Sequence, residues 1–207
     1  MSALSQILQH KIVAILRGMQ SKDVLRIVTA LSYGGVNIVE ITLNSVDALS
    51  AIESLSHTLG DKVLIGAGTV LNAADAKNAI AAGAKFLISP SLDIDVIKIT
   101  KDAGLVSIPG AFTPTEILTA FNNGADIVKV FPTLNSGYIK NILAPLNHIP
   151  VMPTGGINLD NIKEFNVPGV VAFGIGTSLV NSKAIVSEMY LQDITDKARR
   201  FTEAVKS

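Results

Sequence analysis

The sequence predicts an α/β protein that forms a (β/α)8, or TIM, barrel with an extra N-terminal helix, in which residues 1–207 make one domain. Eight short apolar runs rich in β-branched residues alternate with amphipathic stretches of helical period, as expected of repeated βα units around a parallel sheet. The runs begin at intervals of about 23 residues, enough for a strand, a helix and two loops. A doubly wound dinucleotide-binding fold fits less well, because no G-x-G-x-x-G turn follows the first run.

The apolar runs are the expected strands, and they begin near Ile12, Ile38, Leu64, Phe86, Val106, Ile127, Val151 and Val170. Helical periodicity predicts helices over residues 23–32, 46–59, 73–82, 93–103, 114–123 and 139–146. Three of these helices should stop at a following glycine, at Gly83, Gly104 and Gly124. Residues 2–10 are expected to form the extra helix on the barrel floor, and residues 187–206 the last helix.

The composition narrows the class of protein. With 48% hydrophobic and 16% charged residues, against a typical charged share of about 25%, the chain is globular with much buried structure. Lys and Arg number 17, as do Asp and Glu, and Trp is absent, so neither a basic face nor a base-stacking platform indicates nucleic-acid binding.

The same composition bears on location and on metals. The chain has no cysteine, which excludes disulfides and thiolate metal sites and is typical of a reducing compartment. No signal peptide and no continuous apolar membrane span is found, so we expect a cytoplasmic protein that contacts no membrane. The three histidines show no metal-ligand spacing, and we expect no metal.

Lys129 is the most informative residue, because it is a charged side chain inside an apolar run that reads DIVKVFP over residues 126–132. Period-2 alternation places it on one strand face with Ile127 and Phe131, and burial in a barrel should lower the pKa of its amine. A neutral lysine is a nucleophile that forms an imine with a carbonyl. The alternative is a structural lysine in a buried ion pair or one that extends to solvent.

Glu40 is a second charge inside an apolar run, on the face shared with Ile38 and Thr42. A carboxyl beside an imine-forming lysine can transfer protons if burial raises its pKa. The alternative is a simple counter-ion of Lys129, which would keep the lysine charged and unreactive.

Two glycine-rich segments follow the last two runs, where barrels often bind phosphate. Both are expected to precede helices, although glycine also serves tight βα loops. The candidate phosphate-binding residues are Gly155, Gly156, Gly174, Gly176 and Ser178.

Four further residues lie where strands end at the expected mouth of the barrel. The Thr69 hydroxyl could bind a carboxylate, or Thr69 could simply begin a helix. Arg17 could orient an anionic ligand or hold Glu40 ionised, or could serve in a structural ion pair. Pro90 and Phe131 could form an apolar wall or be ordinary packing.

Together these segments resemble the motif series of the KDPG/KHG aldolase family, in family order from about residue 12 to 178. The matching motifs are RG at 17–18, EITLNS at 40–45, GAGTV at 66–70, SP at 89–90, PG at 109–110, KVFP at 129–132 and GG at 155–156.

The resemblance implies a homotrimeric class I aldolase without a metal or other cofactor, which acts on 2-keto-3-deoxy-6-phosphogluconate and related 2-keto acids. It implies that Lys129 forms a Schiff base with pyruvate and that Glu40 transfers protons. Thr69 and Arg17 would hold the pyruvyl carboxylate, and the glycine-rich segments would lie at the phosphate end.

The branch of the family is mixed in this sequence. Gluconate-type members carry an arginine that contacts the substrate carboxylate, and this chain has Asn44 at that position. Asn44 is a candidate for the same contact, but its side chain has no positive charge. The Leu-Asn-Ser segment resembles the galactonate-type branch, which however has proline in place of Thr42. The preferred C4 epimer therefore stays open.

The hypothesis is retro-aldol cleavage of a 2-keto-3-deoxy-6-phospho sugar acid to pyruvate and glyceraldehyde 3-phosphate, with 4-hydroxy-2-oxoglutarate as a further candidate substrate. Two alternatives remain. A phosphosugar epimerase or isomerase would use Glu40 as base without a covalent adduct, and a non-catalytic phospho-sugar sensor would not need Lys129.

Overall fold

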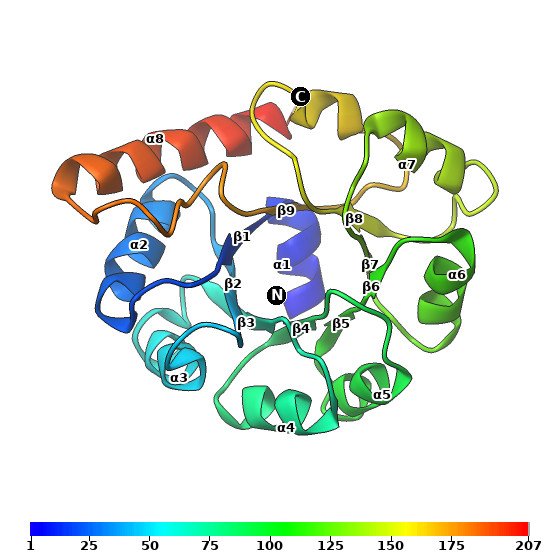
Figure 1. Cartoon of the computed structure of the whole chain (residues 1–207), viewed down its shortest axis with the longest axis horizontal. Coiled ribbons are helices and arrows are strands. Elements are labelled where there is room, and N and C mark those ends of the chain that lie inside the picture. The colour runs from blue at the N-terminus through cyan, green and yellow to red at the C-terminus, as the bar shows by residue number, and fades with distance from the viewer. Residues whose placement is uncertain (207) are drawn as a thin grey trace.

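The computed structural model describes residues 1–206, in which parallel strands form a ring with helices outside it (Figure 1). The strands are β1 (Ile12–Leu16), β2 (Ile38–Thr42), β3 (Leu64–Gly68), β4 (Phe86–Ile88), β5 (Val106–Ile108), β6 (Gly110–Ala111), β7 (Val128–Val130), β8 (Val151–Pro153) and β9 (Phe173–Ile175). The helices are α1 (Ala3–His10), α2 (Ser21–Tyr33), α3 (Ala48–Leu59), α4 (Ala73–Ala81), α5 (Ile94–Asp102), α6 (Pro114–Asn122), α7 (Ser136–Leu143), the 3₁₀ helix η1 (Ile162–Phe165) and α8 (Glu188–Ala204).

The hydrogen-bonded strands form two parallel sheets. A curled six-stranded sheet has the order β5-β4-β3-β2-β1-β9, and a three-stranded sheet has the order β6-β7-β8. The sheets separate at Pro109, between β5 and β6, because proline has no N–H to donate to the ladder. On the other side, single parallel bridges pair Val151 with Val170 and Thr154 with Gly174.

The core has an inner and an outer layer. Alternate strand residues point inward, where Val13, Ile38, Leu64 and Phe86 belong to one buried cluster, while the opposite strand faces pack against the helices. The Phe86 ring occupies the space beside Gly66, where an added Cβ would lie 2.4 Å from the ring. The inner cluster therefore fills the ring at the end away from the glycine-rich loops.

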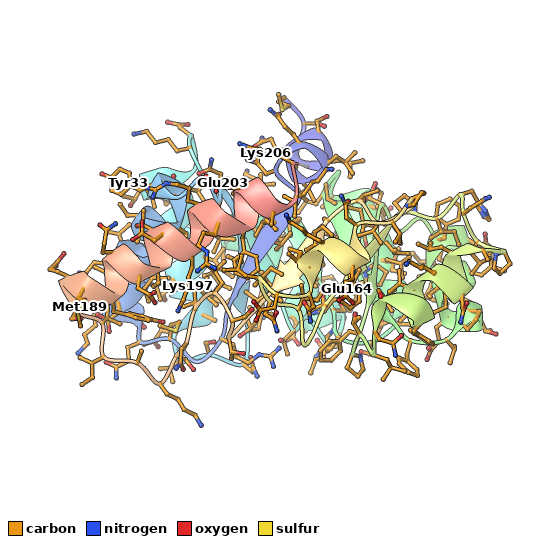
Figure 2. The ribbon with its side chains drawn as sticks, turned by 90° about the horizontal axis from the view of Figure 1, so that it is seen from above. Tyr33, Glu164, Met189, Lys197, Glu203 and Lys206 are labelled. Carbon is orange, nitrogen blue, oxygen red and sulfur yellow. The ribbon has the colours of Figure 1, made fainter. Side chains whose placement is uncertain are left out.

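The predicted N-terminal helix is confirmed as α1, whose first turn is capped by the Ser2 side chain. In Figure 1, α1 lies across the centre of the ring, and Figure 2 shows it at one end of the strands, beside the last turn of α8 near Lys206. Ile7 is the buried residue of α1, and it joins the inner cluster. Lys11 Nζ donates to the Val205 carbonyl at 3.5 Å, which ties α1 to the end of α8.

Most predicted boundaries agree with the structure. Strands β1 to β5 and β8 begin at the predicted residues, and β7 begins one residue later than predicted, at Val128. The helices α4, α5 and α6 are followed by Gly83, Gly104 and Gly124, whose φ angles of 96°, 71° and 97° reverse the chain as predicted.

The last two units differ from the prediction. The run at Val170 forms only an isolated bridge, and β9 begins at Phe173. No long helix directly follows either glycine-rich segment: η1 follows β8, and α8 begins only at Glu188, after a long loop. After β8, the Asn158 carboxamide accepts hydrogen bonds from the Asp160 and Asn161 amides and so caps the turn that leads into η1. This 3₁₀ helix ends at Phe165, shortly before Pro168, which disfavours helical backbone in the residue before it.

Within residues 1–206, no helix is both long and apolar enough to cross a membrane.

Ile7→Ala should lower the free energy of unfolding by about 2–5 kcal/mol, because it removes a fully buried side chain from the inner cluster. Leu8→Ala on the same helix is the matched control, since Leu8 is 40% exposed, and it should cost less than about 1 kcal/mol. Urea denaturation followed by circular dichroism measures both values. Equal losses would show that α1 does not seal the inner cluster.

Candidate active site

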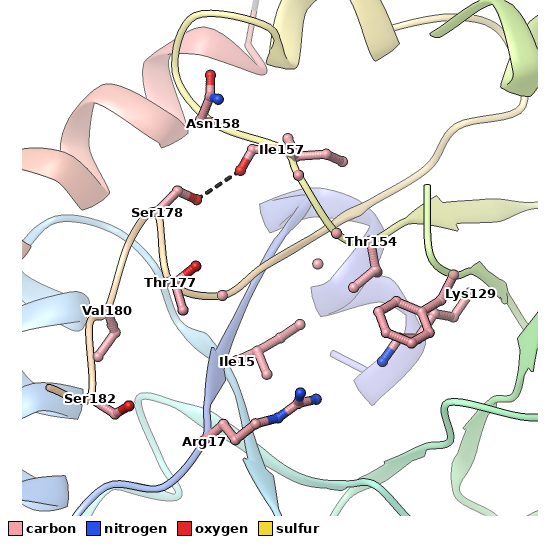
Figure 3. A pocket seen from close by; sticks show the side chains of 15 residues that line it. Ile15, Arg17, Lys129, Thr154, Ile157, Asn158, Thr177, Ser178, Val180 and Ser182 are labelled. Carbon is pink, nitrogen blue, oxygen red and sulfur yellow. Dashed lines mark hydrogen bonds between the residues drawn. The ribbon is translucent and has the colours of Figure 1, made fainter. Parts of the chain in front are cut away.

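A cavity of about 480 Å³ opens at the carboxyl ends of β1, β7, β8 and β9 (Figure 3). This is the end of a parallel barrel where active sites are built. Eight of the predicted site residues line it: Arg17, Lys129, Phe131, Gly155, Gly156, Gly174, Gly176 and Ser178. The structure therefore brings the predicted lysine, arginine and glycine-rich segments to one cavity.

Lys129 lies in the middle of β7, where the neighbouring strands place Gly110 and Met152 in register with it. Its side chain is only 2% exposed, and Nζ lies 5.0 Å from the centre of the Phe131 ring. Burial lowers the pKa of Lys129; the charge of Glu40 acts against this shift, and the charge of Arg17 adds to it. The amine therefore loses its proton more readily than an exposed lysine does.

Glu40 lies in β2, in register with Ile15 and Gly66, and is fully buried. Among the described residues, neither of its carboxyl oxygens has a hydrogen-bond partner. Burial raises the pKa of Glu40, although the positive charges of Lys129 and Arg17 lower it in part. The carboxyl therefore retains its proton to a higher pH than an exposed glutamate does.

The Glu40 carboxyl needs the glycine that faces it on β3. A Cβ on Gly68 would lie 1.7 Å from Glu40 Oε1, closer than any real contact, so no larger residue fits beside this carboxyl. Glu40 is not among the residues that line the cavity, but it lies within electrostatic range of Lys129, which does line it.

The geometry distinguishes a catalytic Lys129–Glu40 pair from a structural ion pair. The ion pairs of residues 1–206 include no bridge between Lys129 and Glu40 within 4.0 Å. Burial shifts both pKa values toward the neutral forms. This arrangement differs from a structural salt bridge and favours the neutral forms of both the amine and the carboxyl.

Arg17 follows the last residue of β1 and is exposed to the cavity. Figure 3 shows its guanidinium directed toward the side of the cavity on which Lys129 lies. Its fixed positive charge favours the neutral form of Lys129 and opposes the neutral form of Glu40. A guanidinium here can also bind an anionic group of a ligand.

The two glycine-rich loops both line the cavity and lie side by side (Figure 3). The Ser178 hydroxyl donates to the Ile157 carbonyl at 2.7 Å and joins the loops. Gly174 packs on Thr154, whose Oγ1 would lie 2.3 Å from a Cβ at that position. Because no long helix begins here, the loop amides, and not a helix terminus, are available to an anion.

Besides Glu40, three predicted residues do not line this cavity. Thr69 is half-buried and adopts a φ of 57°, a left-handed conformation that is unusual for a β-branched residue. Pro90 is half-buried, and its backbone packs against Gly110. Asn44 is exposed and lines a separate cavity of about 440 Å³ together with Gly18 and Ser45.

Several cavity residues were missed by the sequence reasoning. They are Ile15, Thr154, Ile157, Asn158, Thr177, Val180 and Ser182. Thr154 and Thr177 directly flank the glycine-rich motifs, so their proximity was a usable signal. No sequence pattern indicated Ser182, because it lies in the long loop between β9 and α8.

The described residues 1–206 contain no group of three or more His, Asp or Glu side chains that could hold a metal ion.

Known proteins provide the comparison for this geometry. Residues 4–196 match the family model described as KDPG and KHG aldolase. The chain is 35% identical to a probable 2-dehydro-3-deoxy-6-phosphogalactonate aldolase of Rhizobium meliloti (strain 1021), over 83% of this chain and 82% of the relative. It is also 35% identical to a 2-dehydro-3-deoxy-phosphogluconate aldolase of Haemophilus influenzae, over 89% of this chain and 88% of the relative.

A solved structure shares the fold at 28% identity and a TM-score of 0.85, over 96% of this chain and 97% of the other. It is a KDPG aldolase of Legionella pneumophila with pyruvate captured as a covalent carbinolamine intermediate. The family model spans most of the chain and the two curated relatives exceed 30% identity, so the chain belongs to the KDPG and KHG aldolase family.

Proposed function

We propose that this protein is a class I aldolase that cleaves a 2-keto-3-deoxy-6-phospho sugar acid to pyruvate and glyceraldehyde 3-phosphate. The observation that carries the proposal is the buried Lys129 amine, which opens into a cavity and whose pKa is lowered by burial next to Glu40. The covalent pyruvate carbinolamine in the Legionella pneumophila relative supports an imine mechanism.

The reaction begins when the neutral Lys129 amine attacks the C2 carbonyl of the substrate and forms a carbinolamine. Protonated Glu40 assists the departure of the carbinolamine hydroxyl as water, which leaves an iminium ion and a Glu40 carboxylate. The carboxylate then accepts the proton of the C4 hydroxyl, directly or through water.

The C3–C4 bond breaks as the C4 oxygen becomes an aldehyde, and its electron pair moves into the iminium ion to give an enamine. Glyceraldehyde 3-phosphate leaves. Glu40, now protonated, gives its proton to C3 of the enamine and so regenerates an iminium ion. Water adds to this iminium ion as the Glu40 carboxylate accepts a proton from the water, and collapse of the carbinolamine releases pyruvate and restores the Lys129 amine. Each proton that Glu40 gives is regained within the cycle, so no cofactor takes part in the proposal.

Arg17 and Thr69 hold the pyruvyl carboxylate in this proposal, with Phe131 and Pro90 as its apolar contacts. Arg17 and Phe131 line the cavity, which supports their part directly. The positive φ of Thr69 supports a positioned hydroxyl, since strained backbone gathers at ligand sites. Asn44 lines the second cavity beside Gly18 and is the proposed further contact of the substrate carboxylate.

The phosphate of the substrate lies, in this proposal, between the loops that carry Gly155, Gly156, Gly176 and Ser178. These loops line the cavity, and Figure 3 shows Ser178 on the side of the cavity opposite Lys129. A solved relative of Zymomonas mobilis, similar over 95% of this chain, holds 3-phosphoglycerate, which supports a phosphorylated ligand.

The C4 epimer is not part of this proposal. The galactonate-type and gluconate-type relatives are equally similar to the chain, at 35% identity each. Turnover of each epimer and of 4-hydroxy-2-oxoglutarate would assign the branch.

We propose further that residues 1–207 form one domain and that its strands form a closed eight-stranded barrel. We also propose that the protein is a cytoplasmic homotrimer. The bridge between Thr154 and Gly174 supports closure of the ring. The trimer and the location follow from the family resemblance and the absence of cysteine.

Borohydride reduction with pyruvate present should add one reduced pyruvyl unit to the protein, on Lys129. Intact mass and peptide mapping measure it. Lys129→Met should abolish the adduct and lower kcat/KM by about 10³-fold or more. Lys140→Met, an exposed lysine on α7, is the matched control and should retain both. A folded wild-type protein without an adduct would favour the epimerase or sensor function.

The pH midpoint of adduct formation should lie below the usual lysine pKa of about 10.4, because burial favours the neutral amine. Glu40→Gln removes a charge that raises the pKa of Lys129, so the midpoint should fall further. Arg17→Met removes a charge that lowers this pKa, so the midpoint should rise. Initial trapping rates from pH 5 to 10 measure it. Shifts of the same sign in both variants would contradict the electrostatic account.

Gly176→Val should raise KM for the phosphorylated substrate about tenfold, and much less for 4-hydroxy-2-oxoglutarate, which has no phosphate. A Cβ on Gly176 meets no atom within 4 Å and its φ is not left-handed, so the new side chain can occupy open space without disturbing the fold. Steady-state kinetics with both substrates test this. Equal changes in KM would place the phosphate elsewhere.

A further inference from the structure

Two hydroxyl groups connect the loops that leave β1 and β2. The Gly18 amide donates to Ser45 Oγ at 2.8 Å. Ser45 Oγ lies 3.1 Å from Thr42 Oγ1, which in turn donates to the Leu16 carbonyl at 3.4 Å. Thr42 is fully buried at the end of β2, and Ser45 is half-buried in the following turn. The chain of contacts therefore begins and ends on the β1 side, at residues 16 and 18.

Arg17 is the residue enclosed by these contacts. The carbonyl of the peptide group before it accepts from Thr42, and the amide of the peptide group after it donates to Ser45. When both peptide planes around a Cα are held, the direction of its Cα–Cβ bond is fixed as well. The direction in which the Arg17 side chain enters the cavity is thus set from β2.

The Ser45 hydroxyl is not needed for the turn in which it lies. That turn is closed by the backbone, since the Ser45 amide donates to the Thr42 carbonyl at 3.0 Å. Gly18 has a φ of 65°, so the chain leaves the strand geometry directly after Arg17. The Gly18 amide therefore points to the Ser45 side chain, which follows β2. The hydroxyl groups of Thr42 and Ser45 thus bind the backbone on either side of Arg17 and are not needed to close the turn after β2.

We propose that Ser45, together with Thr42, is a positioning residue for Arg17, and that it acts on the reaction only through the guanidinium. The inference rests on the proposed function, in which Arg17 holds the substrate carboxylate near Lys129. The hydroxyl groups of Thr42, at the end of β2, and Ser45, in the following turn, thus have a positioning role that is separate from the proton transfer by Glu40. Neither hydroxyl lines the cavity that contains Lys129.

The test compares Ser45→Ala with Ser45→Thr, which keeps a hydroxyl, and with Ser50→Ala, an exposed serine on α3, as the matched control. Ser45→Ala should raise KM for the aldol substrate roughly 2- to 10-fold, the effect of one lost hydrogen bond. It should also raise the pH midpoint of pyruvate trapping, in the direction of Arg17→Met. Ser45→Thr should restore both values, and Ser50→Ala should change neither.

A double-mutant cycle separates positioning from general destabilisation. If Ser45 acts through Arg17, Ser45→Ala should add no further rise in KM or in the pH midpoint to the Arg17→Met protein. Additive effects, or a lower unfolding midpoint with unchanged KM and pH profile, would overturn the proposal.

A crystal structure of the Ser45→Ala protein gives a readout that does not depend on catalysis. We expect the Arg17 side chain to leave its wild-type position, and an unmoved Arg17 would overturn the positioning role. A wild-type protein that forms no adduct on Lys129 would overturn the proposed function instead, so the two failures are distinguishable.

Discussion

Burial of one amine and one carboxyl inside the ring of strands is the constraint to which the rest of the site is adapted. Placing the charged forms of Lys129 and Glu40 in an apolar interior is costly, and no hydrogen bond to the Glu40 carboxyl offsets the cost among the described residues. The protein lowers it by favouring the neutral forms of both groups. A neutral lysine is also the form that attacks a carbonyl, so the same desolvation that opposes folding makes the nucleophile.

The backbone around this pair is shaped to admit it. Gly68 leaves room for the carboxyl of Glu40, and Gly66, on the same strand, leaves room for the Phe86 ring that closes the interior. The two glycines of β3 thus leave space for the buried carboxyl of Glu40 and for the buried ring of Phe86. Thr69 follows directly with a left-handed φ, so β3 ends in strained backbone next to its two close contacts.

The sequence predicts the regular part of the fold well, because strands β1 to β5 are short apolar runs separated by segments of helical period. It fails after β8, where Asn158 caps a turn that continues only as the short 3₁₀ helix η1, which ends shortly before Pro168. In the site, Lys129 and Glu40 could be predicted because a charge within a buried run is visible in the sequence. Ser182 could not, because its loop is held by two hydrogen bonds between Tyr190 and the Asn181 backbone, which no local pattern shows.

Arg17 connects these points, because its positive charge acts on both members of the buried pair. It favours the neutral amine of Lys129 and the ionised carboxyl of Glu40, which are the forms needed at different steps. A substrate carboxylate bound to the guanidinium would partly cancel its charge. The electrostatic balance of the pair then depends on whether the cavity is filled: the empty site favours an amine ready to attack, and the filled site favours a carboxyl that keeps its proton until the carbinolamine loses water.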